Sequence, residues 1–240
     1  MTDIPKSHPR YLSLKMRESL VKGVEDGITS MAGLIAHGRG EMFDYLIGEE
    51  TISTAERAEK KAVEEIIEAK NPVISVNGNV AALVPKEIVE LGKTLDTKLE
   101  VNLFHRIPER VSKIKGALEN NGAEEVFGLE PEEKIPGLDH KRALCSHEGI
   151  YTSDVVLVPL EDGDRAEALK KMGKKVITID LNPLSRTSRV ADITIVDNIV
   201  RAVPNMMEFE PLYDDFDNDE NLKKTLLFMS ERLKNLSEEI

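Results

Sequence analysis

Apolar residues in the first third of the chain, from residue 11 to about residue 70, recur at the spacing of amphipathic helices. A first helix stops at Gly27, because glycine commonly ends a helix. A second helix, over 41–47, follows a turn at 37–40, and a third opens at Ser53 or Thr54 and ends before Asn71-Pro72. The apolar positions that define the first helix are Met16, Leu20, Val21 and Val24.

The pattern changes between Pro72 and about Pro204, where short β-branched runs alternate with helical stretches. Strands that alternate with helices form βαβ units. We therefore predict an α/β fold: a Rossmann-like, largely parallel sheet with an N-terminal helical region and a C-terminal helix. Right-handed crossovers place the carboxyl ends of all strands at one edge, where such sheets bind ligands. The predicted strands are PVISV, LEVNLF, EEVFGL, SDVVLVPL, KVITIDL and ADITIVD.

The last part of the chain holds an acidic stretch, DDFDNDEN, and a helix with an apolar seam of 4-3-4-3-4 spacing. The seam either docks on the chain's own core or helps to build a dimer. A length of 240 residues suits one domain over 1–240, with a helical region over 1–70, a Rossmann-like core over 71–204 and the acidic loop with its helix over 205–240. The seam consists of Leu222, Leu226, Met229, Leu233, Leu236 and Ile240.

Composition and charge narrow the class of protein. A net charge of −12 disfavours nonspecific binding to nucleic acids or anionic membranes, because the global field repels polyanions. No apolar run approaches the roughly 18 residues of a membrane span, and MTDIPKSHPR lacks the apolar stretch of a signal peptide. We therefore expect a cytoplasmic protein without membrane or nucleic-acid partners. Cys145 is the only cysteine, so the chain forms no internal disulfide.

The segment IDLNPLSRTS, 179–188, follows the predicted strand KVITIDL and is dense in polar side chains. Asp180 at the strand end suits the hydroxyls of a ribose. Asn182, Ser185, Arg186 and Thr187 supply donors for phosphate, and arginine does so with a bidentate fork. The alternative is a polar turn that caps a helix, since the same residue types crowd ordinary turns.

A second candidate is Ala36-His37-Gly38-Arg39-Gly40, interpreted as a glycine-bearing loop before a helix N-terminus, which favours anions. The alternative is a flexible turn with an exposed arginine. Neither GxxxxGK[ST] nor GxGxxG occurs, which disfavours a P-loop kinase and a standard dinucleotide dehydrogenase. Arg17 flanks the apolar face of its helix, where it either snorkels to solvent or pairs with an anion.

Three further groups of polar residues have both a binding and a structural interpretation. The Asn77-Gly78-Asn79 loop carries amides suited to a polar substrate, or simply forms a tight turn. The carboxylates of 161–165 either hold Mg²⁺, orient an amine or cap the next helix. The cluster of Lys6, His8 and Arg10 is either functional or a solvated tail.

Several of these segments together resemble one family. AHGRGEMFDYLIGE, PVISVNGNVAALVP, DVVLVPLEDGDRAEALKKMGK and IDLNPLSRTS are similar to archaeal phosphopantothenate synthetases, and the resemblance runs from about residue 4 to 207. It implies an ATP-dependent, AMP-forming ligase that joins 4-phosphopantoate to β-alanine in coenzyme A biosynthesis, in a homodimer with Mg²⁺. The ATP contacts that the resemblance implies fall on Arg17, Arg39, Asp180, Leu181, Asn182, Arg186, Thr187, Asn198 and Ile199.

The remaining roles are hypotheses. We assign binding of the substrate phosphate to Lys6, His8 and Arg10 together with Asn77 and Asn79. None of these residues is among the implied ATP contacts. His37 is the candidate base for the β-alanine amine, and Arg186 the candidate cation at the reacting phosphate. A noncatalytic adenine-nucleotide sensor and a nicotinamide-dependent oxidoreductase that uses Asp180 to bind ribose stay open as alternatives.

Overall fold

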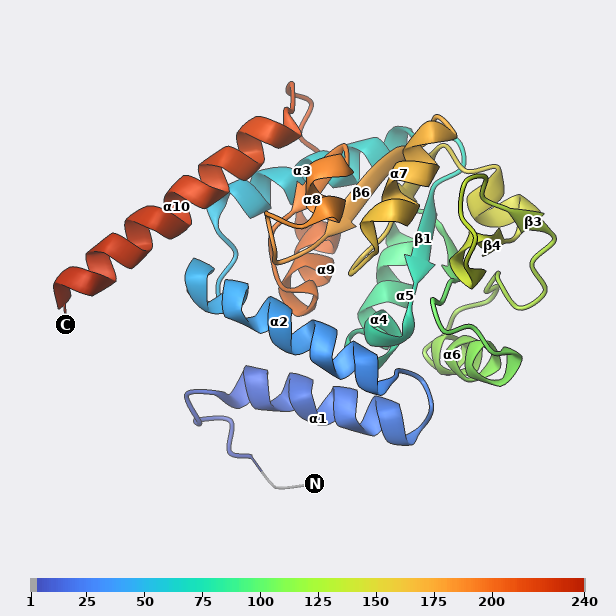
Figure 1. Cartoon of the computed structure of the whole chain (residues 1–240), viewed down its shortest axis with the longest axis horizontal. Helices are drawn as coiled ribbons and strands as arrows, with labels where there is room; N and C mark the ends of the chain where they lie inside the picture. The colour runs from blue at the N-terminus through green and yellow to red at the C-terminus, as the bar shows by residue number, and fades with distance from the viewer. Residues whose placement is uncertain (1–3, 240) are drawn as a thin grey trace.

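The computed structural model of the chain describes residues 4–239 and confirms the α/β class. A five-stranded parallel sheet, in the order β2-β1-β5-β6-β7, forms its centre (Figure 1). The strands are β1 (Val73–Val76), β2 (Lys98–Val101), β5 (Val155–Leu157), β6 (Lys175–Ile179) and β7 (Ile193–Ile195). All are short and buried, as expected for strands covered on both faces.

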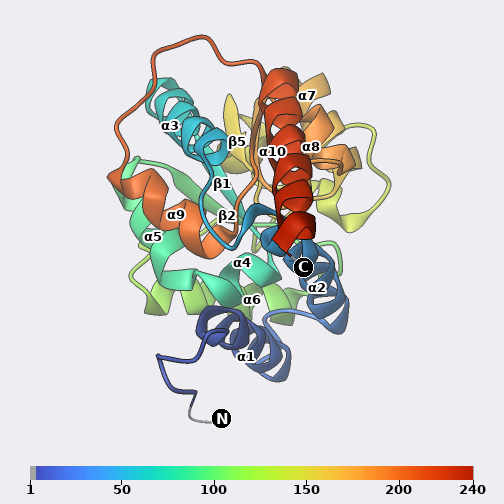
Figure 2. The same cartoon turned by 90° about the vertical axis from the view of Figure 1, so that its left-hand side faces the viewer.

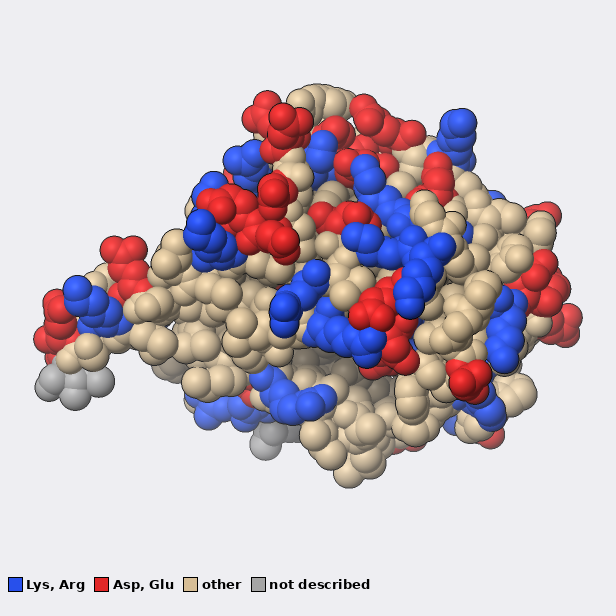
Figure 3. All heavy atoms as spheres, turned by 45° about the horizontal axis from the view of Figure 1, so that its top comes forward, with Lys and Arg blue, Asp and Glu red and all other residues tan. Residues whose placement is uncertain are grey.

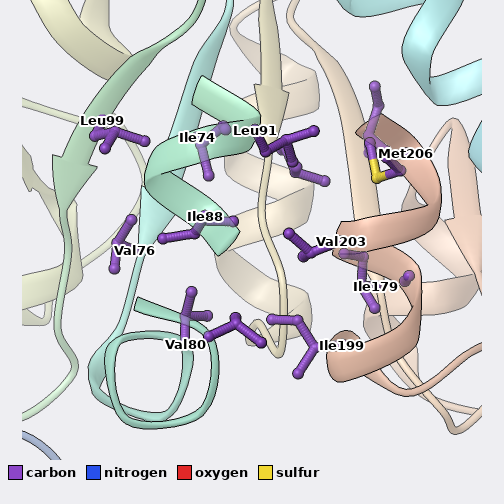
Figure 4. Packing of buried hydrophobic residues seen from close by; sticks show 14 of the residues in the cluster. Ile74, Val76, Val80, Ile88, Leu91, Leu99, Ile179, Ile199, Val203 and Met206 are labelled. Atoms are coloured by element: carbon purple, nitrogen blue, oxygen red, sulfur yellow. The ribbon is translucent and has the colours of Figure 1, made fainter. Parts of the chain in front are cut away.

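Helices cover both faces of this sheet. One face packs on α3 (Ser53–Glu68), α5 (Pro85–Thr94) and α9 (Ile199–Glu208), and Figure 4 shows apolar residues of α5 and α9 against those of the strands. The other face packs on α7 (Gly163–Lys171) and on a small β3–β4 hairpin (Glu133–Lys134 and Leu144–Cys145), which the sequence pattern did not predict. The residues labelled in Figure 4 are Ile74, Val76, Val80, Ile88, Leu91, Leu99, Ile179, Ile199, Val203 and Met206.

One predicted strand is absent from the sheet. The run EEVFGL makes only a single parallel bridge, between Phe127 and Glu100. Gly128 then turns the chain away with a φ of +94°, and a Cβ there would lie 2.3 Å from the Val101 carbonyl. The close approach of two backbones therefore ends the pairing after one residue.

The N-terminal helices lie across the carboxyl ends of the strands. α1 (Tyr11–Glu25) and α2 (Met31–Ile47) run past α4 (Gly78–Leu83), toward which the arrowhead of β1 points in Figure 1. α6 (Pro108–Asn120) flanks the β2 edge, and α8 (Arg186–Val190) joins β6 to β7. α2 thus covers the edge of the sheet that was predicted to bind ligands.

The C-terminal helix α10 (Asn218–Glu239) divides the seam between two environments. Leu222 and Met229 are buried against Ile47 and Leu181, so part of the seam docks on the chain's own core. Leu233 and Leu236 are exposed at 50% and 38%, and this half of the helix projects beyond the body in Figure 1 and lies toward the viewer in Figure 2. Ile240 lies outside the described residues. No helix within 4–239 is both long and apolar enough to cross a membrane.

Candidate functional site

Two neighbouring cavities open at the carboxyl edge of the sheet. The strand order reverses between β1 and β5, and ligands of doubly wound sheets bind at such a switch point. The first cavity, of about 460 Å³, lies between α2 and the loops after β5 and β6. The second, of about 320 Å³, lies between the start of α2 and the loops after β1 and β2. Both fall where parallel-strand topology predicted a site.

The two cavities share a wall. Ala36, Asn79, Leu160 and Asp162 line both of them. Leu160 has a φ of +53°, a left-handed conformation that is costly for a side chain with a Cβ, and its carbonyl accepts a hydrogen bond from the Asn77 side-chain nitrogen at 3.2 Å. The strained backbone of Leu160 is therefore stabilised by its contacts with the surrounding structure. Nothing in the sequence pattern had singled out Leu160.

The loop after β6 forms one side of the first cavity and is organised by Asp180. Its Oδ1 accepts a hydrogen bond from the Asn182 backbone N–H at 2.9 Å, and its Oδ2 accepts one from the Ser185 hydroxyl at 2.5 Å. Burial raises the pKa of Asp180, while these hydrogen bonds work in the opposite direction. Asp180, Leu181, Asn182, Ser185 and Thr187 all line the cavity, so the structure brings together most of the segment that the sequence had singled out.

The interpretation of this loop as a turn that caps a helix is confirmed, and the same loop lines the cavity. Ser185 caps α8 by accepting a hydrogen bond from the Ser188 backbone N–H at 3.0 Å. Thr187 donates its hydroxyl to the Glu161 carbonyl at 2.8 Å and so ties the loop after β6 to the loop after β5. The polar residues therefore cap a helix and shape a cavity wall at the same time.

The interpretation of 37–40 as a loop is wrong. Ser30 caps α2 through its hydroxyl, and His37, Gly38, Arg39 and Gly40 lie inside the helix, which runs unbroken to Ile47. The N-cap at Ser30 and the packing of α2 across the sheet edge outweigh the low helix propensity of the glycines. The helix N-terminus available to an anion is consequently at Ser30, not at residue 40.

The helix still brings the predicted residues to the site. His37, Arg39 and Gly40 line the first cavity, together with Phe43 one turn further on. A Cβ on Gly40 would lie 3.8 Å from the Leu181 side chain, and one on Gly38 would meet nothing within 4 Å. The small residues therefore leave room between α2 and the loop after β6.

His37 has the protonation behaviour of a base. Its pKa lies below the ordinary value, chiefly because burial disfavours the imidazolium form, although Glu41 and Asp44 act in the opposite direction. Its Nε2 is buried and has no hydrogen-bond partner among residues 4–239. At neutral pH the ring is therefore neutral and can accept a proton.

Two predicted cations are engaged elsewhere in this structure. Arg17 pairs with Glu41 at 2.6 Å, and Arg186 forms a bidentate pair with Glu167 at 2.7 and 3.0 Å. Neither lines a cavity. The Arg186 side chain is 62% exposed, and its aliphatic part lies against Gly163. Only Arg39 among the three predicted ATP arginines faces the first cavity.

Asn198 and Ile199 are also absent from the cavity walls. Asn198 caps α9 by accepting from the Val200 N–H at 3.3 Å, and its side-chain nitrogen donates to Asp44 on α2 at 2.7 Å. Ile199 is buried in the core beneath the sheet edge. In this structure Asn198 therefore joins α9 to α2, whereas Ile199 packs in the main hydrophobic core.

The predicted substrate residues are divided by the fold. Lys6, His8 and Arg10 are exposed before α1 and line neither cavity. Asn79 lines both cavities and Asn77 the second. Their amides bond within the protein: Asn77 donates to the Pro159 carbonyl at 2.9 Å, and Asn79 to the Gly33 carbonyl at 3.0 Å. These two residues hold the shared wall and the first turn of α2 together.

The carboxylates after β5 are largely neutralised. Glu161 is 1% exposed and pairs with both Arg142 and Arg165, and Asp162 also pairs with Arg142 at 2.6 Å. No group of three or more His, Cys, Asp or Glu side chains within the described part of the chain is arranged to hold a metal ion. A Mg²⁺ at the first cavity would thus take most of its ligands from nucleotide phosphates and water.

Comparison with known proteins gives a consistent result. Residues 54–240 match the model of the phosphopantothenate/pantothenate synthetase family. A 4-phosphopantoate–β-alanine ligase of Thermococcus kodakarensis is 56% identical over 100% of this chain and 97% of its own, and one of Methanosarcina mazei is 52% identical over 100% and 99%. One of Methanospirillum hungatei is 56% identical over 86% and 84%. The resemblance of the sequence motifs is confirmed, and the chain belongs to the phosphopantothenate/pantothenate synthetase family.

Proposed function

We propose that this protein is a 4-phosphopantoate–β-alanine ligase that uses ATP to make 4′-phosphopantothenate, a step of coenzyme A biosynthesis. The observation that carries the proposal is the shared wall of Ala36, Asn79, Leu160 and Asp162. A ligase of this kind must bring a nucleotide and an acid together at one point. Two adjoining cavities at the switch point of the sheet supply that arrangement.

The proposed reaction has two steps. A carboxylate oxygen of 4-phosphopantoate attacks the α-phosphorus of ATP, and the bond to the bridging oxygen breaks to release pyrophosphate. The amine of β-alanine then attacks the acyl carbon, the bond to the adenylate oxygen breaks, and AMP leaves. The amine loses a proton in this second step, so a neutral base near the acyl carbon accelerates it.

We place ATP in the first cavity. Asp180 lies at the end of β6, where a carboxylate accepts hydrogen bonds from ribose hydroxyls. Leu181, Asn182 and Thr187 line the same side, and Arg39 supplies a cation from α2. Arg17 and Arg186 are proposed to join them by exchanging Glu41 and Glu167 for the more highly charged phosphates. Asn198 acts through the position of α2, to which it is hydrogen-bonded, and Ile199 acts through the packing of the start of α9 in the core.

His37 is the proposed base, because it is neutral at neutral pH and lines the cavity that would hold the adenylate. Arg186 is the proposed cation at the α-phosphate, where positioned positive charge stabilises the transition state. Mg²⁺ would accompany the ATP phosphates and neutralise part of their charge.

The assembly and location are proposed on separate grounds. The exposed half of α10 carries Leu233 and Leu236, which supports a homodimer that covers this apolar face. A net charge of −12 and the interleaved acidic and basic side chains in Figure 3 disfavour nucleic-acid and membrane partners. A biosynthetic ligase with these properties fits the cytoplasm.

The decisive assay measures products while substrates are omitted one at a time. AMP and pyrophosphate should form only with ATP, Mg²⁺ and 4-phosphopantoate together, and 4′-phosphopantothenate only when β-alanine is added. ADP in place of AMP would contradict the adenylate mechanism. Tight ATP binding without any AMP would favour the nucleotide sensor, and an absorbance change with a nicotinamide cofactor would favour the oxidoreductase.

A further inference from the structure

The second cavity contains a cation that the sequence pattern did not single out. Arg110 lies on the first turn of α6 and lines this cavity beside His105 and the start of α2. Its Nε donates to the Ile28 carbonyl at 2.9 Å and its Nη1 to the His105 carbonyl at 3.2 Å. Both partners are neutral, and within residues 4–239 Arg110 forms no ion pair. Its charge is therefore uncompensated.

The approach of Arg110 to the sheet edge depends on a glycine. A Cβ on Gly78 would lie 2.5 Å from the Arg110 Nη2 and 2.6 Å from the Ile28 carbonyl oxygen. Gly78 begins α4, directly after β1, where ligands of such sheets bind. The missing side chain thus lets a guanidinium group lie against the first turn of α4 at the switch point.

The other charged residues at this cavity do not balance the positive charge of Arg110. Arg142 also lines it, but its guanidinium is neutralised by Glu161 and Asp162. Burial lowers the pKa of Arg110, and the Arg142 guanidinium contributes in the same direction despite its ion pairs, so a bound anion would stabilise the charged form of Arg110. The first turn of α2 also lines this cavity, and the positive end of a helix dipole favours an anion.

We propose that Arg110 binds the phosphate of the acid substrate in the second cavity and makes the enzyme select the phosphorylated acid over the free one. This inference rests on the proposed ligase function. With its phosphate at Arg110, the acid would extend its carboxylate across the wall of Asn79 and Leu160 toward the nucleotide. The exposed Lys6, His8 and Arg10 are then not needed for phosphate binding.

The test compares Arg110→Ala, Arg110→Gln and the control Lys113→Ala. Lys113 is a cation on the same helix that lies outside both cavities and pairs with Glu109 at 3.2 Å. Arg110→Gln keeps a donor for the Ile28 carbonyl but removes the charge, so it remains informative if Arg110→Ala does not fold. For each variant, kcat/KM is measured with 4-phosphopantoate and with pantoate, together with the affinity for ATP by calorimetry.

In both Arg110 variants, kcat/KM for 4-phosphopantoate should fall by about 100-fold, because a charge-assisted pair is lost, while kcat/KM for pantoate and ATP affinity change little. Inorganic phosphate should compete with the acid in the wild-type enzyme and in Lys113→Ala, but not in the Arg110 variants. An unchanged preference for the phosphorylated acid in a folded Arg110 variant would overturn the inference. Failure of the wild-type enzyme to form AMP would instead overturn the ligase assignment.

Discussion

The side-chain nitrogen of Asn198 donates a hydrogen bond to the Asp44 carboxylate over 2.7 Å, and so joins the start of α9 to the last turn of α2. Asp44 is 3% exposed and also pairs with Arg201 at 2.5 Å. α2 carries His37 and Arg39 into the first cavity. A residue that does not line the cavity therefore helps to hold the two that do.

The replacement Asn198→Ala should weaken ATP binding through α2. Loss of the bond to buried Asp44 should lower the free energy of unfolding by about 1–2 kcal/mol, since a buried acceptor loses a partner. The KM for ATP should rise while the KM for 4-phosphopantoate stays nearly constant. Urea unfolding and initial rates test both parts. Asn121→Ala is the control, because that amide bonds only to the exposed end of its own helix; equal effects of the two variants would contradict the role of α2.

His37→Gln should remove a pH dependence from the second chemical step. The pKa of His37 lies below its ordinary value because of burial, so the ring is neutral and competent above that pKa and loses competence as the pH falls through it. The variant should be slower by about 10²–10⁴-fold. Single-turnover reaction of the adenylate with β-alanine between about pH 5 and 8 gives the ratio of the two rate constants, in which titration of the amine cancels. A ratio independent of pH would exclude His37 as the base.

Arg186 and Glu167 should have opposite effects on ATP. Arg186→Ala should raise the KM for ATP or lower kcat, while the free energy of unfolding changes little, because the ion pair between Arg186 and Glu167 is exposed to solvent. Glu167→Gln should lower the KM for ATP, because it frees the guanidinium. Arg189→Ala is the matched control, because Arg189 is a cation on the same helix that is not paired with Glu167. Unchanged ATP dependence in both the Arg186 and Glu167 variants would remove Arg186 from the site.

Glu59 should make the protein less stable as the pH rises. Its side chain is fully buried, which raises its pKa from 4.5 to about 9, with the nearby Asp197 adding to the effect. The native state therefore holds a proton that the unfolded chain releases. Stability from this group is complete below about pH 4.5 and is lost progressively up to about pH 9.

The variant Glu59→Gln isolates this effect, because it keeps the size of the side chain without the titration. Its free energy of unfolding relative to the wild-type protein should increase with pH by at most about 1.4 kcal/mol per unit. Chemical unfolding at several pH values between about 5 and 9 measures the difference. A constant difference over this range would show that Glu59 is ionised in the native protein.

Local patterns predicted the elements that have strong periodic signals. The parallel strands around Ile74, Val156 and Ile177 follow from β-branched runs between helical stretches, and the helices over 53–68 and 218–239 follow from their apolar spacing. Parallel topology then placed Asp180 at the ligand-binding edge. The start of α2 was missed, although Ser30 is a good N-cap, because the glycines at 38 and 40 suggested a loop.

The sequence by itself determined the fold class, the family and the polar loop around Asp180, because these depend on periodicity, strand-end position and long motifs. Only the tertiary structure decided that Arg110 and Gly78, 32 positions apart in the chain, meet at the second cavity, and that Arg142 is neutralised there by Glu161 and Asp162. Charge compensation depends on which side chains fold onto each other, and no local pattern records those distances. The placement of an uncompensated arginine is therefore a property of the folded chain.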